Sequence, residues 1–150
     1  MFLGARTSTR NASGSFGVSY VSVPPYNVPL CASSVWLFGL QQNSTSRSNL
    51  ALLNVGENGD PLSGKAFFTI EIFDGETGRK TRTVEGIEVG PRRWIQLDGV
   101  LSRFAPSSTQ GYARVTQTSG TNSFVTYAVI NDGGAPGERT GDGAFITSSP

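Results

Sequence analysis

Histidine is absent from the 150 residues, and cysteine occurs once, at Cys31. Without histidine the chain lacks the usual general base, the usual zinc ligand and the base of a serine or cysteine nucleophile. One cysteine forms no disulfide framework and no cysteine metal cluster, so we interpret Cys31 as a small buried apolar residue. Neighbouring carboxylates are interpreted as solvated charges rather than a glycosidase pair: Glu71, Asp74, Glu85, Glu88. The sequence therefore predicts a protein that is not an enzyme.

Charge is also sparse, since only 15% of the residues are charged and the formal net charge is +1. The ten arginines are scattered and do not alternate with aromatic residues as in a base-stacking surface. No apolar run approaches the roughly 18 residues of a membrane span, and the stretch after Met1 lacks the apolar region of a signal peptide. We expect no nucleic-acid partner and no membrane insertion, and a signal upstream of this sequence if the protein is exported.

Turn-forming residues are abundant: 19 glycines and 8 prolines, with many serines and threonines, separate short intervals rich in Val, Ile, Phe, Tyr and Thr. A turn signal about every 8–12 positions is typical of an all-β sandwich or barrel. We expect an antiparallel β-sandwich of about eight to ten strands. The expected strands are 16–23, 35–40, 50–55, 66–73, 79–84, 90–97, 111–118 and 123–131.

Alternation within these intervals predicts where each strand lies. Residues 66–73 carry apolar side chains on both faces, which indicates a central strand, whereas the polar run 79–84 suits an edge strand. The tetrapeptide SGTN at 119–122 is interpreted as a hairpin turn between the last two strands. One short helix is expected near 98–104, with Asp98 as its N-cap and Val100, Leu101 and Phe104 on one apolar face.

The chain also divides by composition. The segment PPYNVPL at 24–30 contains three prolines, which exclude regular structure and indicate an extended connector. We therefore expect a hairpin in residues 1–23, a proline-rich connector in 24–33 and a β-sandwich module in 34–150.

The glycine-rich segment NDGGAPGERTGDGAF at 131–145 fits neither an EF-hand nor a phosphate-binding loop. Counted from Asp132, positions 3 and 5 of an EF-hand would be Gly134 and Pro136, and a phosphate-binding loop would need a lysine. An irregular calcium site formed by Asp132, Glu138 and Asp142 is one interpretation, because calcium accepts flexible oxygen geometry. The favoured interpretation is a glycine-permitted turn without a metal or cofactor.

Two further groups of residues are candidates for binding. Trp36 and Trp94, with Tyr112 and Tyr127, form a sugar-stacking face in one interpretation, with Gln96 bonding hydroxyl groups; in the other they pack in the core. Arg47 and Asn49 contact a ligand in one interpretation. In the other, they satisfy backbone carbonyls or a carboxylate where a strand begins.

Several motifs in order resemble a known family. They are SRSNLALLNVG at 46–56, the turn at 74–78, GPRRWIQ at 90–96, LDGVLSRF at 97–104, the strand at 127–132 and the Thr-Gly-Asp turn at 140–142. Over residues 36–146 the chain resembles a tandem β-sandwich accessory module of large secreted proteins from soil bacteria of the acidobacterial type. The segment 4–20 resembles the end of a preceding repeat.

That family has no assigned activity, so the resemblance implies no catalytic residues. It implies an immunoglobulin-like architecture for the sandwich. It also implies a non-catalytic structural, adhesion or partner-binding module that is secreted or on the cell surface. The expected partners are other domains or copies of the same protein, and surface glycans. The alternative function is a carbohydrate-binding module of a secreted multi-domain enzyme.

Overall fold

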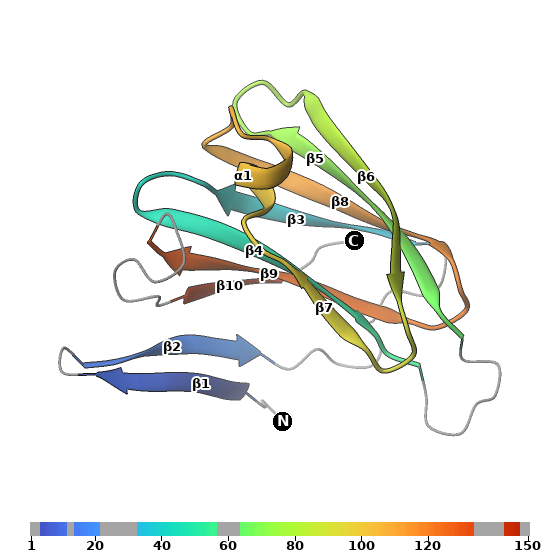
Figure 1. Cartoon of the computed structure of the whole chain (residues 1–150), viewed down its shortest axis with the longest axis horizontal. Helices are drawn as coiled ribbons and strands as arrows, with labels where there is room; N and C mark the ends of the chain where they lie inside the picture. The colour runs from blue at the N-terminus through green and yellow to red at the C-terminus, as the bar shows by residue number, and fades with distance from the viewer. Residues whose placement is uncertain (1–3, 12–13, 22–32, 57–63, 134–142, 148–150) are drawn as a thin grey trace.

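The computed structural model describes residues 4–11, 14–21, 33–56, 64–133 and 143–147. These ranges form ten β-strands in antiparallel sheets and one short helix, so the expected all-β sandwich with a single helix is confirmed. Two four-stranded sheets form the sandwich, and a separate hairpin lies outside it (Figure 1).

Each sheet has a simple strand order. One sheet runs β3-β8-β5-β6 and the other β10-β9-β4-β7. The strands of the first are β3 (Ser34–Gln41), β8 (Gln110–Ser119), β5 (Ala66–Asp74) and β6 (Lys80–Val89). Those of the second are β10 (Gly143–Thr147), β9 (Phe124–Asp132), β4 (Ser46–Asn54) and β7 (Trp94–Leu97). As predicted, the apolar run 66–73 lies inside its sheet and the polar run 79–84 lies in an edge strand.

The core lies between the two sheets because alternate residues of each strand are apolar. Phe68, Ile70 and Ile72 of β5 are completely buried, as are Leu50 and Leu52 of β4. The two layers meet in an edge-to-face contact between Phe68 and Phe124, whose ring centroids are 5.1 Å apart at 66°. Such contacts add specific geometry to the burial of apolar area that stabilises the sandwich.

The helix α1 (Val100–Phe104) forms where the sequence predicts it, but its cap differs. Gly99, not Asp98, occupies the N-cap position, with φ of 56° and no side-chain cap. The Gly99 amide instead donates to Oδ1 of Asn49 at 3.0 Å, while Asp98 accepts from Nε2 of Gln96 at 2.6 Å. Asp98 was the wrong choice because the helix start is satisfied from β4, fifty positions earlier in the chain.

The predicted hairpin at 119–122 is wrong. β8 and β9 belong to different sheets, so this segment crosses from one layer to the other. Nε2 of Gln117 donates to the carbonyl of Asn122 at 3.0 Å, and Nδ2 of Asn122 donates to Oδ1 of Asn54 at 2.9 Å. Because Asn54 lies at the end of β4, this contact holds the crossover at that end of the sandwich.

The predicted strand at 90–97 is shorter than expected. Its first four residues form a turn, in which the Arg93 amide donates to the carbonyl of Gly90 at 3.0 Å and Arg92 has φ of 56°. Only Trp94 to Leu97 pair with β4, from Leu53 to Leu50. Residues 90–93, which alternation assigned to the strand, therefore belong to this turn.

The amino-terminal residues form the expected hairpin. β1 (Gly4–Asn11) and β2 (Gly14–Val21) pair antiparallel from Gly4 with Val21 to Asn11 with Gly14. Cys31 and the proline-rich segment lie outside the described residues. The assignment of the hairpin to a preceding repeat stays a prediction.

Both edge strands of the β3-β8-β5-β6 sheet contain glycine at a register shift. Gly39 in β3 has φ of 84° and Gly86 in β6 has φ of 68°, in the left-handed region that favours glycine.

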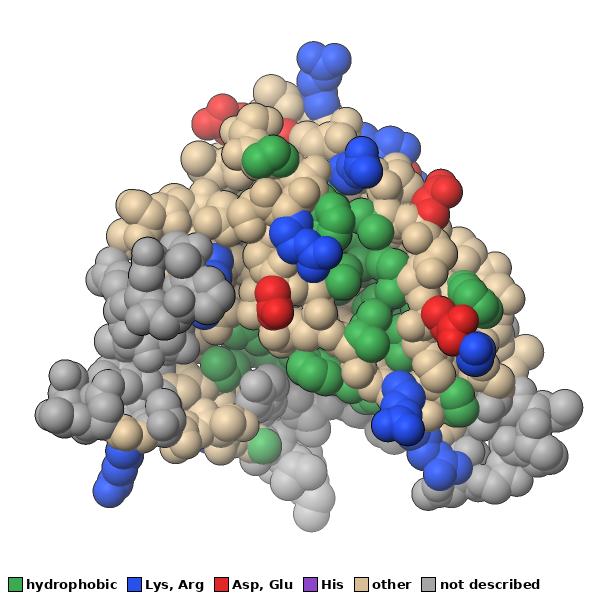
Figure 2. Space-filling model, viewed as in Figure 1, with side chains coloured by type: hydrophobic (Ala, Val, Ile, Leu, Met, Phe, Trp, Pro, Cys, Tyr) green, Lys and Arg blue, Asp and Glu red, His purple; other side chains and the backbone are tan. Residues whose placement is uncertain are grey.

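On the side of the sandwich bounded by β6 and β7, hydrophobic side chains reach the surface (Figure 2). Four residues of these two strands are partly buried against the core: Val84, Ile87, Ile95 and Leu97.

Candidate functional site

The two tryptophans lie on opposite outer faces of the sandwich. Trp36 stands between the buried residues Val35 and Leu37, so it points away from the core on the β3-β8-β5-β6 sheet. Trp94 lies on the outer face of β7, where its indole Nε1 donates to the hydroxyl of Tyr127 at 3.0 Å. The four rings considered as one sugar-stacking face therefore form two separate groups.

Trp36 belongs to an aromatic cluster that we define as Trp36, Phe38, Phe73 and Tyr112. The β-register places Phe38 opposite Tyr112 and Tyr112 opposite Phe73, so three adjacent strands contribute one row of rings. The Trp36 centroid lies 6.0 Å from those of Phe38 and Tyr112 and 5.6 Å from that of Phe73. The sequence interpretation missed Phe38 and Phe73, although each stands on the outer face by alternation.

The rings of the aromatic cluster pack mainly against one another. Phe73 and Tyr112 are parallel within 1° with centroids 5.0 Å apart, an offset-stacked pair. Phe38 is the most exposed member at 54%, while the other three are half-buried. Because the ring faces pack against one another, the cluster forms a continuous apolar surface and not one flat stacking platform.

A charged triad lies next to the aromatic cluster, one residue pair further along the strands. Glu71 is paired across the sheet with Arg114, whose Nε donates to Oε2 at 2.6 Å, and Nζ of Lys80 donates to Oε1 at 2.9 Å. These bonds, that of Lys80 first, hold the pKa of the Glu71 carboxyl below its ordinary value of 4.5. Since the triad holds two cations and one carboxylate, it carries one excess positive charge.

Arg114 joins the triad to the rings. Its guanidinium carbon lies 5.5 Å from the ring centroid of Trp36, within the range of a cation–π contact. The next row of this face is uncharged, with the hydroxyls of Ser34 and Thr116 hydrogen-bonded at 2.7 Å. The outer face of β3, β8 and β5 thus changes from aromatic to charged to hydroxyl-bearing along the strands.

The second aromatic group is smaller. Trp94 is 49% exposed, and Gln96 stands two residues further on the same face of β7, with its amide bonded to Asp98. Tyr127 packs against Phe145 with ring centroids 4.9 Å apart. The indole N–H and the Gln96 amide that would bind a sugar hydroxyl are both engaged within the chain.

Arg47 and Asn49 on the outer face of β4 contact backbone groups of distant loops. Nη1 of Arg47 donates to the carbonyl of Gly133 at 2.9 Å, and Oδ1 of Asn49 accepts from Gly99 at 3.0 Å. Arg47 thereby joins β4 to the end of β9, and Asn49 joins it to the start of α1.

The predicted calcium ligands fall largely outside the structure described. Asp132 ends β9, whereas Glu138 and Asp142 lie in the segment that is not described. Within the described ranges, no three acidic, histidine or cysteine side chains gather closely enough to hold a metal ion.

The helix α1 has five residues, and no helix of the described ranges has the length and hydropathy needed to cross a membrane.

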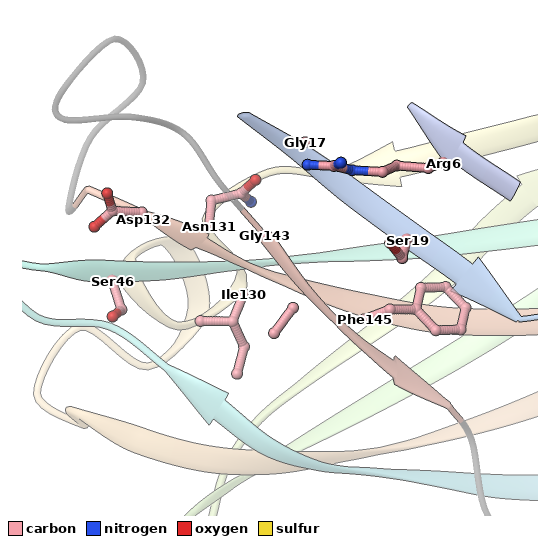
Figure 3. Close-up of a pocket in the computed structure, with 10 residues that line it drawn as sticks. Arg6, Gly17, Ser19, Ser46, Ile130, Asn131, Asp132, Gly143 and Phe145 are labelled. Atoms are coloured by element: carbon pink, nitrogen blue, oxygen red, sulfur yellow. The ribbon is translucent and has the colours of Figure 1, made fainter. Parts of the chain in front are cut away.

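A groove of about 790 Å³ separates the hairpin from the β10-β9-β4-β7 sheet. Figure 3 shows Arg6 and Ser19 of the hairpin on one side and Asp132, Gly143 and Phe145 of the sandwich on the other. The described residues of its lining are small, polar and apolar and include no clustered catalytic groups, so the groove resembles an incompletely filled contact between two packed elements.

Comparison of the chain with protein-family models, with curated proteins and with solved structures gave no match in any of the three. The resemblance of residues 36–146 to a bacterial accessory module therefore stays a prediction.

Proposed function

We propose that this protein is a non-catalytic binding module that recognises a protein partner through the outer face of β3, β8 and β5. The observation that carries the proposal is the aromatic cluster, in which the side chain of Phe38 is 54% exposed beside three half-buried rings. Contiguous apolar surface of this kind in a soluble domain marks an interaction site.

The composition of this face favours a protein partner. Tryptophan, tyrosine and arginine are the residue types that carry most binding energy in protein interfaces, and Trp36, Tyr112 and Arg114 are in contact here. The charged triad and the hydroxyl row would form the polar rim that surrounds such an apolar centre.

The two edge strands of the β3-β8-β5-β6 sheet are poorly suited to pair with a strand of a partner, so we expect the partner to bind the outer face of the sheet. The glycine bulges of β3 and β6 interrupt the regular ladder that an added strand would need. The absence of histidine supports a role without catalysis. The proposal retains an exported location, secreted or at the cell surface, as the sequence resemblance implies.

The proposal is tested with ligands selected from a random-peptide phage library on the immobilised chain. We expect selected peptides to bind Phe38→Ser at least about fivefold more weakly, because loss of a central aromatic residue typically costs more than about 1 kcal/mol. Trp94→Ser is the matched control on the opposite face and should bind normally. Peptides that bind Phe38→Ser and the unmodified chain equally would contradict the proposed surface.

A carbohydrate-binding function is the second candidate, favoured by the exposed indole of Trp94 beside Gln96. In Trp36→Phe, Trp94 is the remaining tryptophan and reports on this site alone. A fluorescence shift with one member of a polysaccharide panel, lost in Gln96→Ala, would support this candidate. Unchanged fluorescence across the panel would count against it.

A further inference from the structure

The charged triad presents hydrogen-bond donors, and not acceptors, to the outside of the sheet. Glu71 is only 14% exposed, whereas the side chains of Lys80 and Arg114 are 49% and 40% exposed. The Glu71 carboxylate accepts from Lys80 at Oε1 and from Arg114 at Oε2, so both of its oxygens are engaged. A group that approaches this part of the sheet therefore meets the two cations.

Both cations keep N–H groups that the triad does not use. Within the described ranges, the side chains of Lys80 and Arg114 hydrogen-bond only to Glu71. An ammonium group has three N–H bonds and a guanidinium group has five, so most of these donors are available to a further acceptor. Because the triad has one carboxylate for two cations, its excess charge matches one further anion.

The neighbouring carboxylates are engaged elsewhere. Glu88, at the other end of the paired strands β5 and β6, forms an ion pair with Lys65 at 2.7 Å. Asp74, at the end of β5, accepts hydrogen bonds from the turn that follows it. Among the described residues, no carboxylate other than that of Glu71 pairs with either cation of the triad.

Each cation also lies beside a ring of the aromatic cluster. Arg114 is opposite Trp36 in the β-register, and Lys80 is opposite Phe73. On the neighbouring strands β8 and β5 (Figure 1), rings and charges occupy successive outward positions, which are about 6.4–6.8 Å apart along a strand. An extended peptide repeats this spacing between its residues i and i+2. One segment can therefore place an apolar side chain on the rings and a carboxylate on the cations.

From these observations we propose that Lys80 and Arg114 bind a carboxylate of the partner, so that this face recognises an acidic segment with an aspartate or glutamate two residues from an apolar side chain. The inference rests on the proposed function, because it specifies which segment the aromatic cluster receives. Hydrogen bonds from cations to a carboxylate are among the stronger ones in proteins. A single carboxylate matches the excess charge of the triad, whereas a phosphate group carries about −1.5 to −2 charges near neutral pH.

Two synthetic peptides that differ in charge test the inference: acetyl-Asp-Ser-Phe-Ser-Asp-amide and acetyl-Asn-Ser-Phe-Ser-Asn-amide. The full-length chain carries Trp94→Phe, so the fluorescence of Trp36, the other tryptophan, reports binding at this face. In about 0.05 M salt we expect half-saturation at an at least about fivefold lower concentration of the acidic peptide. Because salt screens exposed charges, this advantage should shrink in about 0.5 M salt.

Two lysine variants locate the carboxylate. Lys80→Gln should reduce the advantage of the acidic peptide to less than about twofold, because it removes one of the two cations of the triad. Lys65→Gln is the matched control, since it removes the same charge at the other end of the sheet and should keep the advantage. Circular dichroism checks that both variants are folded.

The outcomes separate this inference from the proposed function. Equal binding of the two peptides, with both weakened by Phe38→Ser, would overturn the carboxylate site and leave the aromatic surface supported. The inference also fails if Lys80→Gln and Lys65→Gln reduce the advantage equally, or if neither peptide changes the fluorescence of Trp36.

An acidic polysaccharide is the competing occupant. Binding of polygalacturonate, but not of the acidic peptide, with the same dependence on Lys80 would overturn the inference in its favour. The phage selection decides the proposed function separately, because its readout is the dependence of any selected peptide on Phe38, whatever the charge of that peptide.

Discussion

Asn54 and Asn122 are 68 positions apart in the chain, and Nδ2 of Asn122 donates to Oδ1 of Asn54 at 2.9 Å inside the protein. Asn54 is completely buried and also bonds the carbonyl of Val89 and the amide of Gly56. One side chain thus connects the ends of β4, β6 and the crossover before β9.

Replacing Asn54 with alanine should lower the free energy of unfolding by about 2–4 kcal/mol, because it leaves more than one buried polar group without a partner. Urea unfolding followed by circular dichroism measures the change. Asn43→Ala is the control, since Asn43 is exposed and bonds only within its own turn. Equal costs for the two variants would contradict the structural role of Asn54.

Asp74 should make the protein more sensitive to acid. Oδ1 accepts from the hydroxyl and the amide of Thr77 at 2.7 and 2.8 Å. These bonds, the hydroxyl first, lower the pKa of Asp74 from 3.8 to about 2. Because the folded pKa is depressed, the stabilisation is present above pH 3.8 and is lost as the pH falls through about 2.

Asp74→Asn should therefore melt at a lower temperature than the unmodified chain at pH 6, with the difference shrinking toward pH 2. Thermal melts between these values measure it. Glu76→Gln removes an exposed charge from the same turn and should have a smaller effect at pH 6. A melting difference for Asp74→Asn that is constant with pH would rule out this linkage.

The charged triad should stabilise the fold more than a simple surface ion pair does. Glu71 is 14% exposed and bonds two cations, whereas Glu88 is 44% exposed and pairs with Lys65 alone. We expect Glu71→Gln to cost about 1 kcal/mol and Glu88→Gln less than about 0.5 kcal/mol. Urea unfolding at low and high salt compares them, and the reverse order would show that the triad has no special role.

Millimolar calcium should leave the melting temperature unchanged if the glycine-rich segment is a turn. A ligand that binds only the folded state raises that temperature, so a calcium site would be evident. Melts with calcium and with a chelator, for the unmodified chain and for Asp132→Ala, make the comparison. A rise that disappears in Asp132→Ala would establish a metal site instead.

Sequence patterns predicted the strands best where alternation is regular. Residues 66–73 alternate without interruption, and β5 covers them in full. The same alternation did not predict the exposed aromatic surface on the outer face, because apolar residues on both sides of a strand suggest that both sides are buried. Phe38 and Phe73 are apolar and outward, and no third layer among the described elements covers them.

Two of the incorrect predictions, the hairpin turn at 119–122 and the helix cap at Asp98, failed because the partner lies far away in the chain. S-G-T-N has the composition of a hairpin turn, yet Nδ2 of Asn122 donates to Oδ1 of the buried Asn54, 68 positions earlier, and this segment forms a crossover. Asp98 has the usual chemistry of a helix cap, yet Asn49 supplies the acceptor. Local propensity cannot identify contacts between residues fifty or more positions apart.

The two ends of the sandwich are closed by different chemistry. At the end near Gly111, α1 inserts Val100 and Leu101, which are completely buried; at the other end, the amides of Asn54, Gln117 and Asn122 bond one another and the backbone. Apolar burial weakens on cooling, whereas hydrogen-bonded closure is lost on heating. We therefore expect backbone amides at the helical end to exchange first at low temperature, and those at the amide-bonded end to exchange first near the melting temperature. Temperature would then decide which end of the domain opens locally.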